Sequence, residues 1–358
     1  MALRDAHPDF LLLFQNSETA FRTKTGSPAQ APTRDGPLLQ FRNVLKLQEA
    51  QRRKPAGTGH PRHSRAAGSS SFLPWKERYD AKQPHATSET HTRCAGAPGS
   101  RAVHPRRETL SLELDALIRS TRVLQGAPSI GRGPERPWPK LSVMDATSSQ
   151  AVHRAPSGTR VTVLNFASGT RVGGDFLTGS LAQEEDLCRT STLFASLSCG
   201  AARPFYEAGR AADAMGAHAA LLSPDVFFFL DDGGQPIIPR RANVISCAAP
   251  NLREFPGDQG RQRQAGELIR TRTHLVLRAA GELETDHLIL GAWGCGVFGN
   301  DPGVVAPAML FALREHLHRH DSTLSEVTFA IPEPRPGGPD NLTTFLEAVL
   351  EHGGRARE

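Results

Sequence analysis

The sequence of 358 residues predicts an α/β fold in its C-terminal part, where helices cover both faces of a largely parallel or mixed sheet. Three observations support this prediction. Short apolar strands alternate with longer amphipathic stretches after residue 140, the chain before residue 106 has the composition of a disordered tail, and two glycine-rich loops directly follow predicted strands. No internal repeat interrupts the pattern.

Residues 1–105 predict a mostly disordered, basic tail. From residue 23 to 105 the chain is rich in Pro, Gly, Ser, Arg and His and has no sustained apolar period. Hydrophobic residues make up 38% of the chain, which is low for a sequence that is packed throughout. A short amphipathic piece over 38–54 could form a helix. We therefore expect one folded domain over 106–358 that does not need the tail.

The first predicted elements of this domain follow in chain order. Residues 108–124 have a helical pattern and precede a Pro/Gly-rich linker. The β-branched run 161–166 predicts a strand. An amphipathic stretch over 182–197 predicts a helix, and the apolar runs at 226–230 and 243–248 predict two more strands.

The same alternation continues to the C-terminus. Residues 262–280 predict a long helix, and the apolar run 287–290 predicts a buried strand. A helix over 304–318, a strand over 327–331 and a closing helix over 341–352 complete the domain.

A glycine-bearing loop joins the strand that ends at Phe166 to a helix that begins near Leu181. Open α/β sheets bind ligands at such carboxyl ends of strands. Gly173 and Gly174 permit positive φ and close approach, so their N–H groups can surround a phosphate beside the helix N-terminus. A plain turn explains such a loop equally well.

An acidic pair, Glu184 and Glu185, lies in the first turn of the helix that follows. Carboxylates gain about 0.3–1 kcal/mol at helix N-termini, which is a purely structural explanation. Successive helical residues point about 100° apart, so only one of the two can face a ligand squarely.

A second glycine-rich loop follows the strand at 287–290 and contains four glycines: Gly291, Gly294, Gly296 and Gly299. Ordering each of them costs about 0.5–1 kcal/mol more than ordering alanine, which suggests a backbone shaped around a ligand. Two such loops suit a ligand with two phosphates, and Trp293 and Phe298 suit stacking on a ribose or base. Trp293 fits the core equally well. Asn300 or Asp301 can cap a helix that starts at Pro302.

Three blocks of the sequence together resemble the microbial-type poly(ADP-ribose) glycohydrolases: VLNFASGTRVGGDF…QEEDLCRTSTL, SPDVFFFLDDGG…VISCAAPN and LGAWGCGVFGNDP. The blocks occur in the family's order and the resemblance spans about residues 141–350, with nothing before residue 108 taking part. It implies a macrodomain-like three-layer α/β/α fold with a mixed sheet. It also implies exo-hydrolysis of the ribose–ribose bond in poly(ADP-ribose), with ADP-ribose as the product.

The resemblance also implies roles for individual residues. Glu185 matches the catalytic glutamate, and Glu184 matches its supporting neighbour at the ribose hydroxyls. Asn165 and Gln183 are expected to contact the substrate. Gly173 and Gly174 match two glycines of the family's triple-glycine loop, and the second diphosphate loop with its packing aromatic matches Gly294, Cys295, Gly296, Val297 and Phe298. Independently, breaking a ribosyl O-glycoside requires an acid and then a base, and one glutamate can serve as both in turn.

The match breaks at Asp175, which stands where the family has its third glycine. A carboxylate about 5 Å from a diphosphate would weaken binding by about 3 kcal/mol, although Asp tolerates left-handed backbone and its charge is screened if it faces solvent. Two further hypotheses therefore remain open. The domain could be an ADP-ribose-binding reader with little or no turnover. Alternatively, it could be a scaffold for a basic tail that binds nucleic acid, but a solvated, disordered tail is the preferred explanation of the basic stretch.

Composition adds expectations about location and partners. The net charge of +5 lies largely outside the predicted domain. The five cysteines show no CxxC pair or zinc-ligand spacing, so we expect free thiols in a reducing compartment, no metal and no cofactor. No apolar run approaches the about 20 residues that span a bilayer, and no secretory signal is evident. We expect an intracellular monomer, cytoplasmic or nuclear, that does not associate with a membrane. Its expected partner is poly(ADP-ribose) or an ADP-ribosylated protein.

Overall fold

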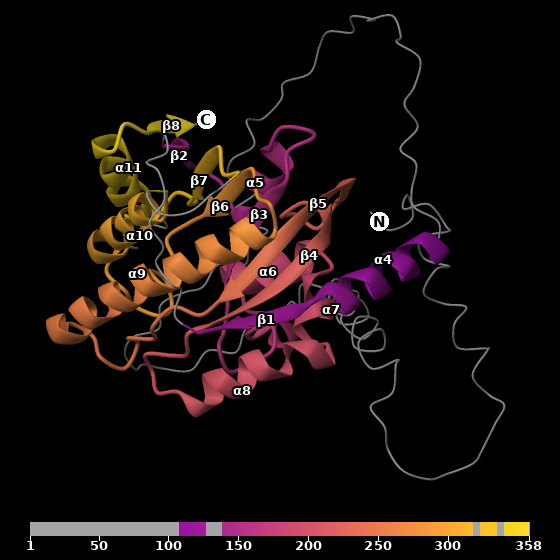
Figure 1. Cartoon of the computed structure of the whole chain (residues 1–358), viewed down its shortest axis with the longest axis horizontal. Helices are drawn as coiled ribbons and strands as arrows, with labels where there is room; N and C mark the ends of the chain where they lie inside the picture. The colour runs from indigo at the N-terminus through magenta and orange to yellow at the C-terminus, as the bar shows by residue number, and fades with distance from the viewer. Residues whose placement is uncertain (1–106, 127–137, 318–322, 335–339, 358) are drawn as a thin grey trace, which may run out of the picture.

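The computed structural model describes residues 107–126, 138–317, 323–334 and 340–357 (Figure 1). The expected tail over 1–105 and the expected helix over 38–54 lie outside these residues. The division of the chain at residue 105 therefore stays a prediction. None of the described helices combines the length and apolar character needed to cross a bilayer.

The described strands form one mixed sheet in the order β1-β4-β5-β3-β6-β7-β2-β8. The strands from β5 through to β8 in this order run parallel to their neighbours, whereas β4 pairs antiparallel with both β5 and β1. The strands are β1 (Arg122–Gln125), β2 (Lys140–Met144), β3 (Val161–Phe166), β4 (Ala219–Leu230), β5 (Pro236–Cys247), β6 (His287–Leu290), β7 (Glu326–Ala330) and β8 (Arg355–Arg357).

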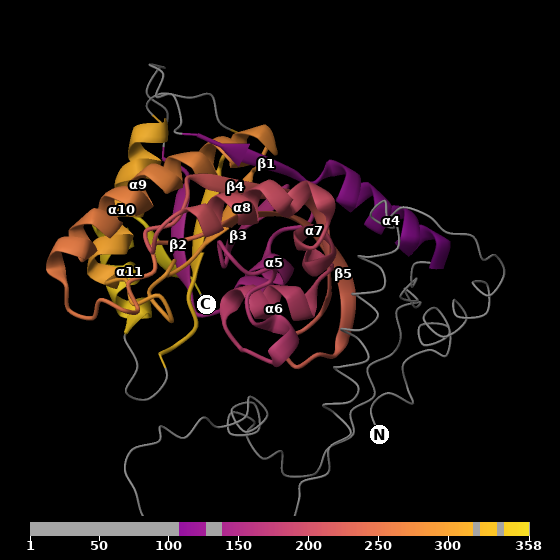
Figure 2. The same ribbon diagram turned by 90° about the horizontal axis from the view of Figure 1, so that it is seen from below.

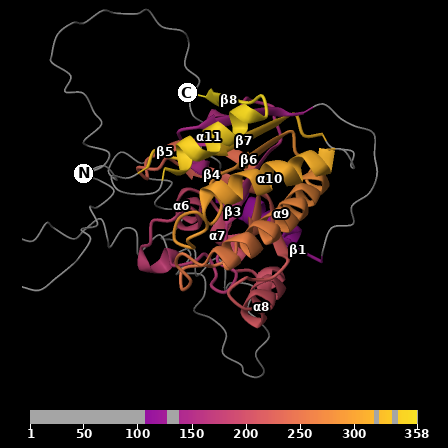
Figure 3. The ribbon, with the colours of Figure 1, turned by 90° about the vertical axis from the view of Figure 1, so that its left-hand side faces the viewer.

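Helices cover both faces of this sheet (Figure 2). Helices α9 (Gln259–Glu282), α10 (Pro302–Leu317) and α11 (Asn341–Glu351) lie on one face, where α9 and α10 pack against each other (Figure 3). The other face carries α4 (Arg107–Ser120), α5 (Ser148–Arg154), α6 (Gln183–Thr190), α7 (Leu193–Leu197) and α8 (Arg203–Ala211), with 3-10 turns η1 (Phe176–Thr178) and η2 (Gly200–Ala202). The expected three-layer α/β/α architecture is confirmed.

Strand β3 lies at the centre of the sheet and is buried on both faces. Val161 and Val163 pack into the core under α5–α8, while Leu164 packs into the core under α9–α11. A parallel strand covered on both sides needs such a continuous apolar run. Two polar side chains of this strand, Thr162 and Asn165, are also fully buried.

The expected helix over 182–197 is two helices, because the chain becomes extended at Ser191. There Ser191 bridges to Phe228 of β4, and Thr192 exchanges hydrogen bonds with Phe227. The Ser191 hydroxyl donates to the carbonyl of Leu187 at 2.6 Å and accepts from the Leu193 N–H. Short hydroxyl side chains can replace helical hydrogen bonds in this way. The apolar pattern continues through the break, so it did not reveal that the helix ends there.

Other predicted boundaries were wrong or incomplete. The expected helix over 108–124 ends at Ser120, and its last residues form β1 at the sheet edge. Strand β4 begins at Ala219, seven residues before the predicted start at 226. Pro224 and Asp225, whose φ is +54°, interrupt that strand at a register shift and obscured its first half. Strand β2, helix α5, helix α8 and strand β8 were not predicted.

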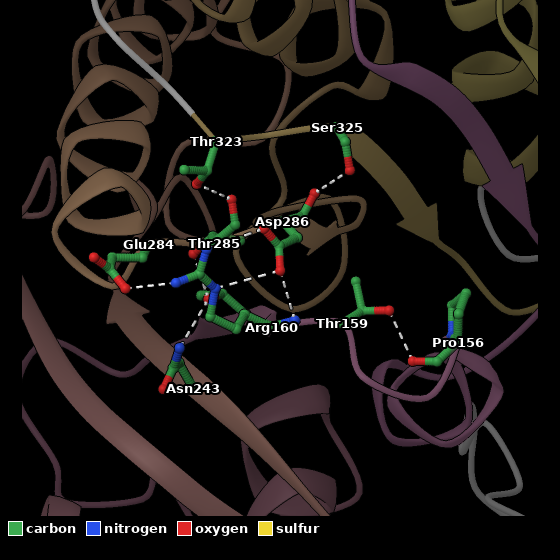
Figure 4. A network of polar contacts seen from close by, with 10 residues as sticks. Pro156, Thr159, Arg160, Asn243, Glu284, Thr285, Asp286, Thr323 and Ser325 are labelled. Atoms are coloured by element: carbon green, nitrogen blue, oxygen red, sulfur yellow. Dashed lines mark hydrogen bonds and ion pairs between the residues drawn. The ribbon is translucent and has the colours of Figure 1, made fainter.

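The two ends of the central strands differ. At the amino ends, Arg160 pairs with Glu284 at 2.5 Å and with Asp286 at 3.3 Å, and Ser325 bonds the Asp286 carbonyl (Figure 4). Strands β5, β3 and β6 are adjacent and parallel, so the loops after all three meet at the opposite, carboxyl edge. Both glycine-rich loops lie there, as α/β ligand sites generally do.

Candidate active site

Glu184 is a buried carboxyl group in the first turn of α6, with 3% of its surface exposed. One of its oxygens accepts a hydrogen bond from the Asn165 side chain at 3.3 Å, and the other accepts from the Ser168 N–H at 2.7 Å. Burial raises the pKa of Glu184 to about 8, against the opposing effect of these donors. Glu184 is therefore mainly protonated at neutral pH.

Glu185, also buried, is held by the glycine loop. Its Oε1 accepts a hydrogen bond from the Asp175 N–H at 2.9 Å. Its Oε2 is buried without a hydrogen-bond partner in the part of the chain that the structure describes. An unsatisfied buried carboxylate oxygen is rare in folded proteins and marks a place where a ligand or water completes the site.

The two glycines of this loop are needed to clear space for protein groups. Gly174 has φ of +60°, and a Cβ on it would lie 2.4 Å from Glu185 Oε1. Gly173 has φ of +65°, and a Cβ on it would lie 2.9 Å from the ring of Phe194. No other residue type combines this backbone with these contacts.

The expected phosphate role of this loop is only partly consistent with its hydrogen bonds. The Gly174 N–H donates to the Arg171 carbonyl at 3.2 Å, and the next N–H, of Asp175, is used by Glu185. These two donors therefore serve the loop and the carboxylate. The loop shapes the surroundings of Glu185 more directly than it forms a phosphate cradle.

Gln183 anchors α6 to the central strand. Its amide nitrogen donates to the Leu164 carbonyl at 2.8 Å and to the Ser148 hydroxyl at 2.9 Å, and its oxygen accepts from the Phe166 N–H at 2.9 Å. Both amide hydrogens are thus used within the protein. The arrangement gives Gln183 a positioning role in place of the substrate contact that the sequence predicts.

Asn165 and Ser246 occupy opposite positions on β3 and β5. The Asn165 amide nitrogen donates to the Ser246 hydroxyl at 2.9 Å as well as to Glu184, while its Oδ1 is buried without a partner among the described residues. This oxygen is a second acceptor available to a ligand beside the carboxyl pair.

The second glycine loop presents a row of free backbone donors. Within the described residues, the N–H groups of Gly296, Val297 and Phe298 donate no hydrogen bond. Consecutive free N–H groups form an anion-binding concavity. Gly294, with φ of +78°, lies against Asn300, whose amide donates to the Gly294 carbonyl at 3.1 Å and holds the loop in shape.

The side chains of this loop divide into core and surface. Trp293 is fully buried and donates from its indole to the Cys247 carbonyl at 3.1 Å, which settles its alternative roles in favour of the core. Cys295 is buried as well, whereas Val297 is 60% exposed and Phe298 is half-buried. Asp301 caps α10, as its carboxylate accepts from the Gly303 N–H at 2.8 Å.

The predicted site residues converge because neighbouring loops touch. A Cβ at Gly169 would lie 3.3 Å from Ala248 after β5, and one at Gly291 after β6 would lie 2.8 Å from the ring of Phe166. Four of the buried polar atoms without a partner belong to this region: Asn165 Oδ1, Glu185 Oε2, Tyr206 Oη and Asn300 Oδ1. No group of metal-ligating side chains is found within the described residues.

Tyr206 is the site residue that the sequence analysis missed. It comes from α8, for which no helix was predicted. Pro204 near the helix start and the apolar spacing of Phe205 and Gly209 were signals that could have revealed this helix.

Asp175 has an exposed side chain, and its charge is the last and smallest of the causes that raise the pKa of Glu184. The Asp175 carboxylate pairs with Arg171 at 2.5 Å, and both side chains are substantially exposed, at 43% and 66%. Its φ is −103°, so the backbone does not require glycine at this position, nor the left-handed tolerance that the sequence analysis invoked. The negative charge is screened and already paired.

Asp175→Gly is therefore expected to change ADP-ribose affinity by less than about threefold and to leave turnover unchanged. Calorimetry with ADP-ribose and product release from the polymer measure the two effects. A gain of more than tenfold in affinity would show that the carboxylate faces the diphosphate.

Carboxyl groups in protected sites are the acids and bases of glycoside hydrolysis, and the chain is a glycoside hydrolase with a macrodomain-like fold. The family described as microbial-type PARG, catalytic domain, matches residues 96–231. The chain belongs to this family of poly(ADP-ribose) glycohydrolases, which confirms the resemblance seen in the sequence. The match begins at residue 96, so the expectation that nothing before residue 108 takes part was wrong.

Solved structures of relatives support this assignment. Poly(ADP-ribose) glycohydrolase from Deinococcus radiodurans in complex with ADP-ribose is 33% identical, with a TM-score of 0.58 over 67% of this chain and 97% of that one. The enzyme from Thermomonospora curvata is 33% identical, with a TM-score of 0.56 over 66% of this chain and 89% of that one. A comparison with curated proteins found no match.

Proposed function

We propose that the chain hydrolyses the ribose–ribose O-glycosidic bonds of poly(ADP-ribose) in the exo mode, releasing ADP-ribose, with Glu185 as the general acid/base. The observation that supports this most directly is the buried Glu185 oxygen left without a partner beside the glycine loop. Similarity to a D. radiodurans enzyme in complex with ADP-ribose supports the choice of ligand.

The reaction follows from one carboxyl group used twice. Protonated Glu185 donates its proton to the leaving ribose oxygen as the bond to the anomeric carbon breaks, which leaves an oxocarbenium-like sugar. The Glu185 carboxylate then takes a proton from water as that water adds to the anomeric carbon. The Asp175 N–H on Oε1 keeps the carboxyl oriented through both steps.

The other site residues bind and orient the substrate in this proposal. The Glu184 carboxyl group bonds the ribose hydroxyls as an acceptor or, when protonated, as a donor, and the free Asn165 Oδ1 accepts from them. The free N–H groups of Gly296, Val297 and Phe298 hold the diphosphate. Because Glu184 is mainly neutral, it adds little repulsion toward the diphosphate or toward ionised Glu185.

Glu184→Gln is expected to remove a pH-dependent loss of stability. The pKa of Glu184 is about 8 in the folded chain against 4.5 as its ordinary value, so its contribution is fully present below pH 4.5 and is lost as pH rises through 8. Relative to the variant, the wild type should lose on the order of 3–5 kcal/mol of unfolding free energy between pH 5 and pH 9. Urea denaturation at both pH values measures this.

A fixed difference between the two proteins is also expected, because a glutamine amide meets the donors of Asn165 and Ser168. Only a change with pH in this difference of unfolding free energy reports the ionisation of the buried Glu184 carboxyl group. Exposed Glu267 offers the control, since Glu267→Gln should follow the wild type. Parallel stability curves for all three proteins would show that Glu184 ionises normally.

Product analysis after incubation with poly(ADP-ribose) tests the proposed function. Monomeric ADP-ribose as the first product supports exo cleavage. Oligomers as first products would contradict that mode. Binding of the polymer without any digestion would show that the chain is a reader. Asp175, the residue that favoured a reader, is exposed and paired with Arg171, which supports the hydrolase over the reader.

A further inference from the structure

The second glycine loop is bonded to helix α9 by one side chain near the N-terminus of that helix. Gln262 donates from its amide nitrogen to the Gly299 carbonyl at 2.9 Å, and its amide oxygen accepts from the Asp301 N–H at 3.0 Å. A carboxamide can make both bonds because it carries a donor and an acceptor side by side. It thus joins a backbone carbonyl and the N–H two residues further along the chain.

These two bonds fix the chain where the row of free N–H groups ends. The row runs from Gly296 to Phe298, and the next N–H, of Gly299, donates to the Gly296 carbonyl at 3.1 Å. Because a peptide group is planar, a bond to its oxygen or to its N–H fixes the orientation of the whole group. Gln262 therefore fixes the peptide groups on both sides of Asn300, at the point where the loop leads into α10.

The turn needs such contacts because glycine makes it flexible. Gly299 is exposed and has φ of +70°. Glycine loses more conformational freedom on ordering than any other residue, so its conformation depends on the bonds around it. The Leu252 N–H donates to the Phe298 carbonyl at 2.8 Å, and the Asn300 amide donates to the Pro250 carbonyl at 2.8 Å. Both of these contacts come from the segment after β5, and Gln262 adds a contact from a second element, α9.

We propose that Gln262 is a positioning residue for ligand binding, whose carboxamide keeps the N–H groups of Gly296, Val297 and Phe298 in place for the diphosphate. This rests on the proposed function, in which these N–H groups hold the diphosphate. Glu185 is held by the first glycine loop, through the Asp175 N–H. The role of Gln262 therefore lies in binding and not in bond cleavage.

Gln262→Met tests the proposal because it removes the carboxamide and keeps the length of the side chain. The Kd for ADP-ribose, measured by calorimetry, should rise about tenfold, since the ligand must then order the loop as it binds. The KM for poly(ADP-ribose) should rise by a similar factor with kcat within about twofold. The variant should fold, because Gly299 and Asp301 are exposed and water can replace the lost partner. An unchanged Kd, or a lower kcat with normal Kd, would overturn the proposal.

Gln264→Met is the matched control. Gln264 lies two residues further along α9, is exposed, and forms no side-chain hydrogen bond within the part of the chain that the structure describes. This variant should bind ADP-ribose and cleave the polymer like the wild type. Equal Kd values for the two methionine variants would show that the carboxamide of Gln262 does not position the loop.

Amide hydrogen exchange follows the contact itself. Without ligand, the Asp301 amide should exchange at least about tenfold faster in Gln262→Met than in the wild type or in Gln264→Met. Faster exchange with an unchanged Kd would show that the contact has no bearing on binding, which overturns the proposal.

Binding and turnover distinguish this proposal from the proposed function. A wild type that binds ADP-ribose but leaves the polymer intact would contradict hydrolysis, and the comparison of Kd values would still decide the role of Gln262. A wild type that does not bind ADP-ribose would overturn the role of Gln262, because the loop would then hold no diphosphate.

Discussion

Glu185→Gln is expected to lower the release of ADP-ribose from poly(ADP-ribose) by a factor of about 10²–10⁴, the usual contribution of a general acid/base. Glutamine keeps an oxygen for the Asp175 N–H, so the loop and the affinity for ADP-ribose should be preserved. The amide cannot protonate the leaving oxygen or activate water. Product release and calorimetry on the same preparation measure both properties.

The control for this substitution is Glu267→Gln, which removes a carboxylate that is 77% exposed on α9. It should leave turnover and binding unchanged. Undiminished turnover in Glu185→Gln would remove Glu185 from the mechanism, and Glu184 would then be the remaining carboxyl group of the pair. Loss of binding together with turnover would instead show that Glu185 holds the ligand.

Gly174→Ala is expected to abolish most activity by a different route. The new Cβ would lie 2.4 Å from Glu185 Oε1 and 3.0 Å from Glu184 Oε2, so both carboxyl groups must move. A displacement of about 1 Å at a reacting group lowers rates about 100-fold. Left-handed alanine adds about 1–2 kcal/mol of destabilisation. Rates should therefore be compared on folded protein at a temperature well below the unfolding midpoint.

Gly158→Ala separates the two effects of this substitution. Gly158 has φ of +81° but nothing within 4 Å of an added Cβ, and it precedes β3 at the end remote from the glycine loops. It should lose similar stability and keep full turnover. If both alanine variants retain turnover, the contact between Gly174 and the carboxyl pair has no bearing on catalysis.

The central strands could be predicted well because their patterns are local. Strands β3 and β6 have the predicted bounds, since both are short apolar runs buried on two faces. Strand β4 was partly missed because Pro224 stands within it at a register shift, where a ladder hydrogen bond is already absent. Helix α6 ends earlier than predicted because Ser191 pairs with a strand that is distant in sequence.

The sequence predicted where the candidate site lies better than it predicted the contacts of each residue in it. The glycines, the carboxyl pair and Asn165 were expected at one edge of the sheet, and they lie there. Contacts across the fold decide what each residue does. Gly174 packs against the Glu185 carboxyl group, and the Gln183 side chain forms hydrogen bonds with the backbone of β3. Neither contact can be predicted from the sequence spacing alone.

The shortness of α6 has a consequence for how the enzyme loses activity on heating. An isolated helix of 8 residues is unstable in water. Helix α6 is tied to β3 at its start by Gln183 and to β4 at its end by Ser191. Glu185, the proposed general acid/base, therefore belongs to the same cooperative unit as the central sheet. Thermal inactivation should coincide with global unfolding. No earlier phase is expected in which α6 is unfolded while the central sheet remains folded.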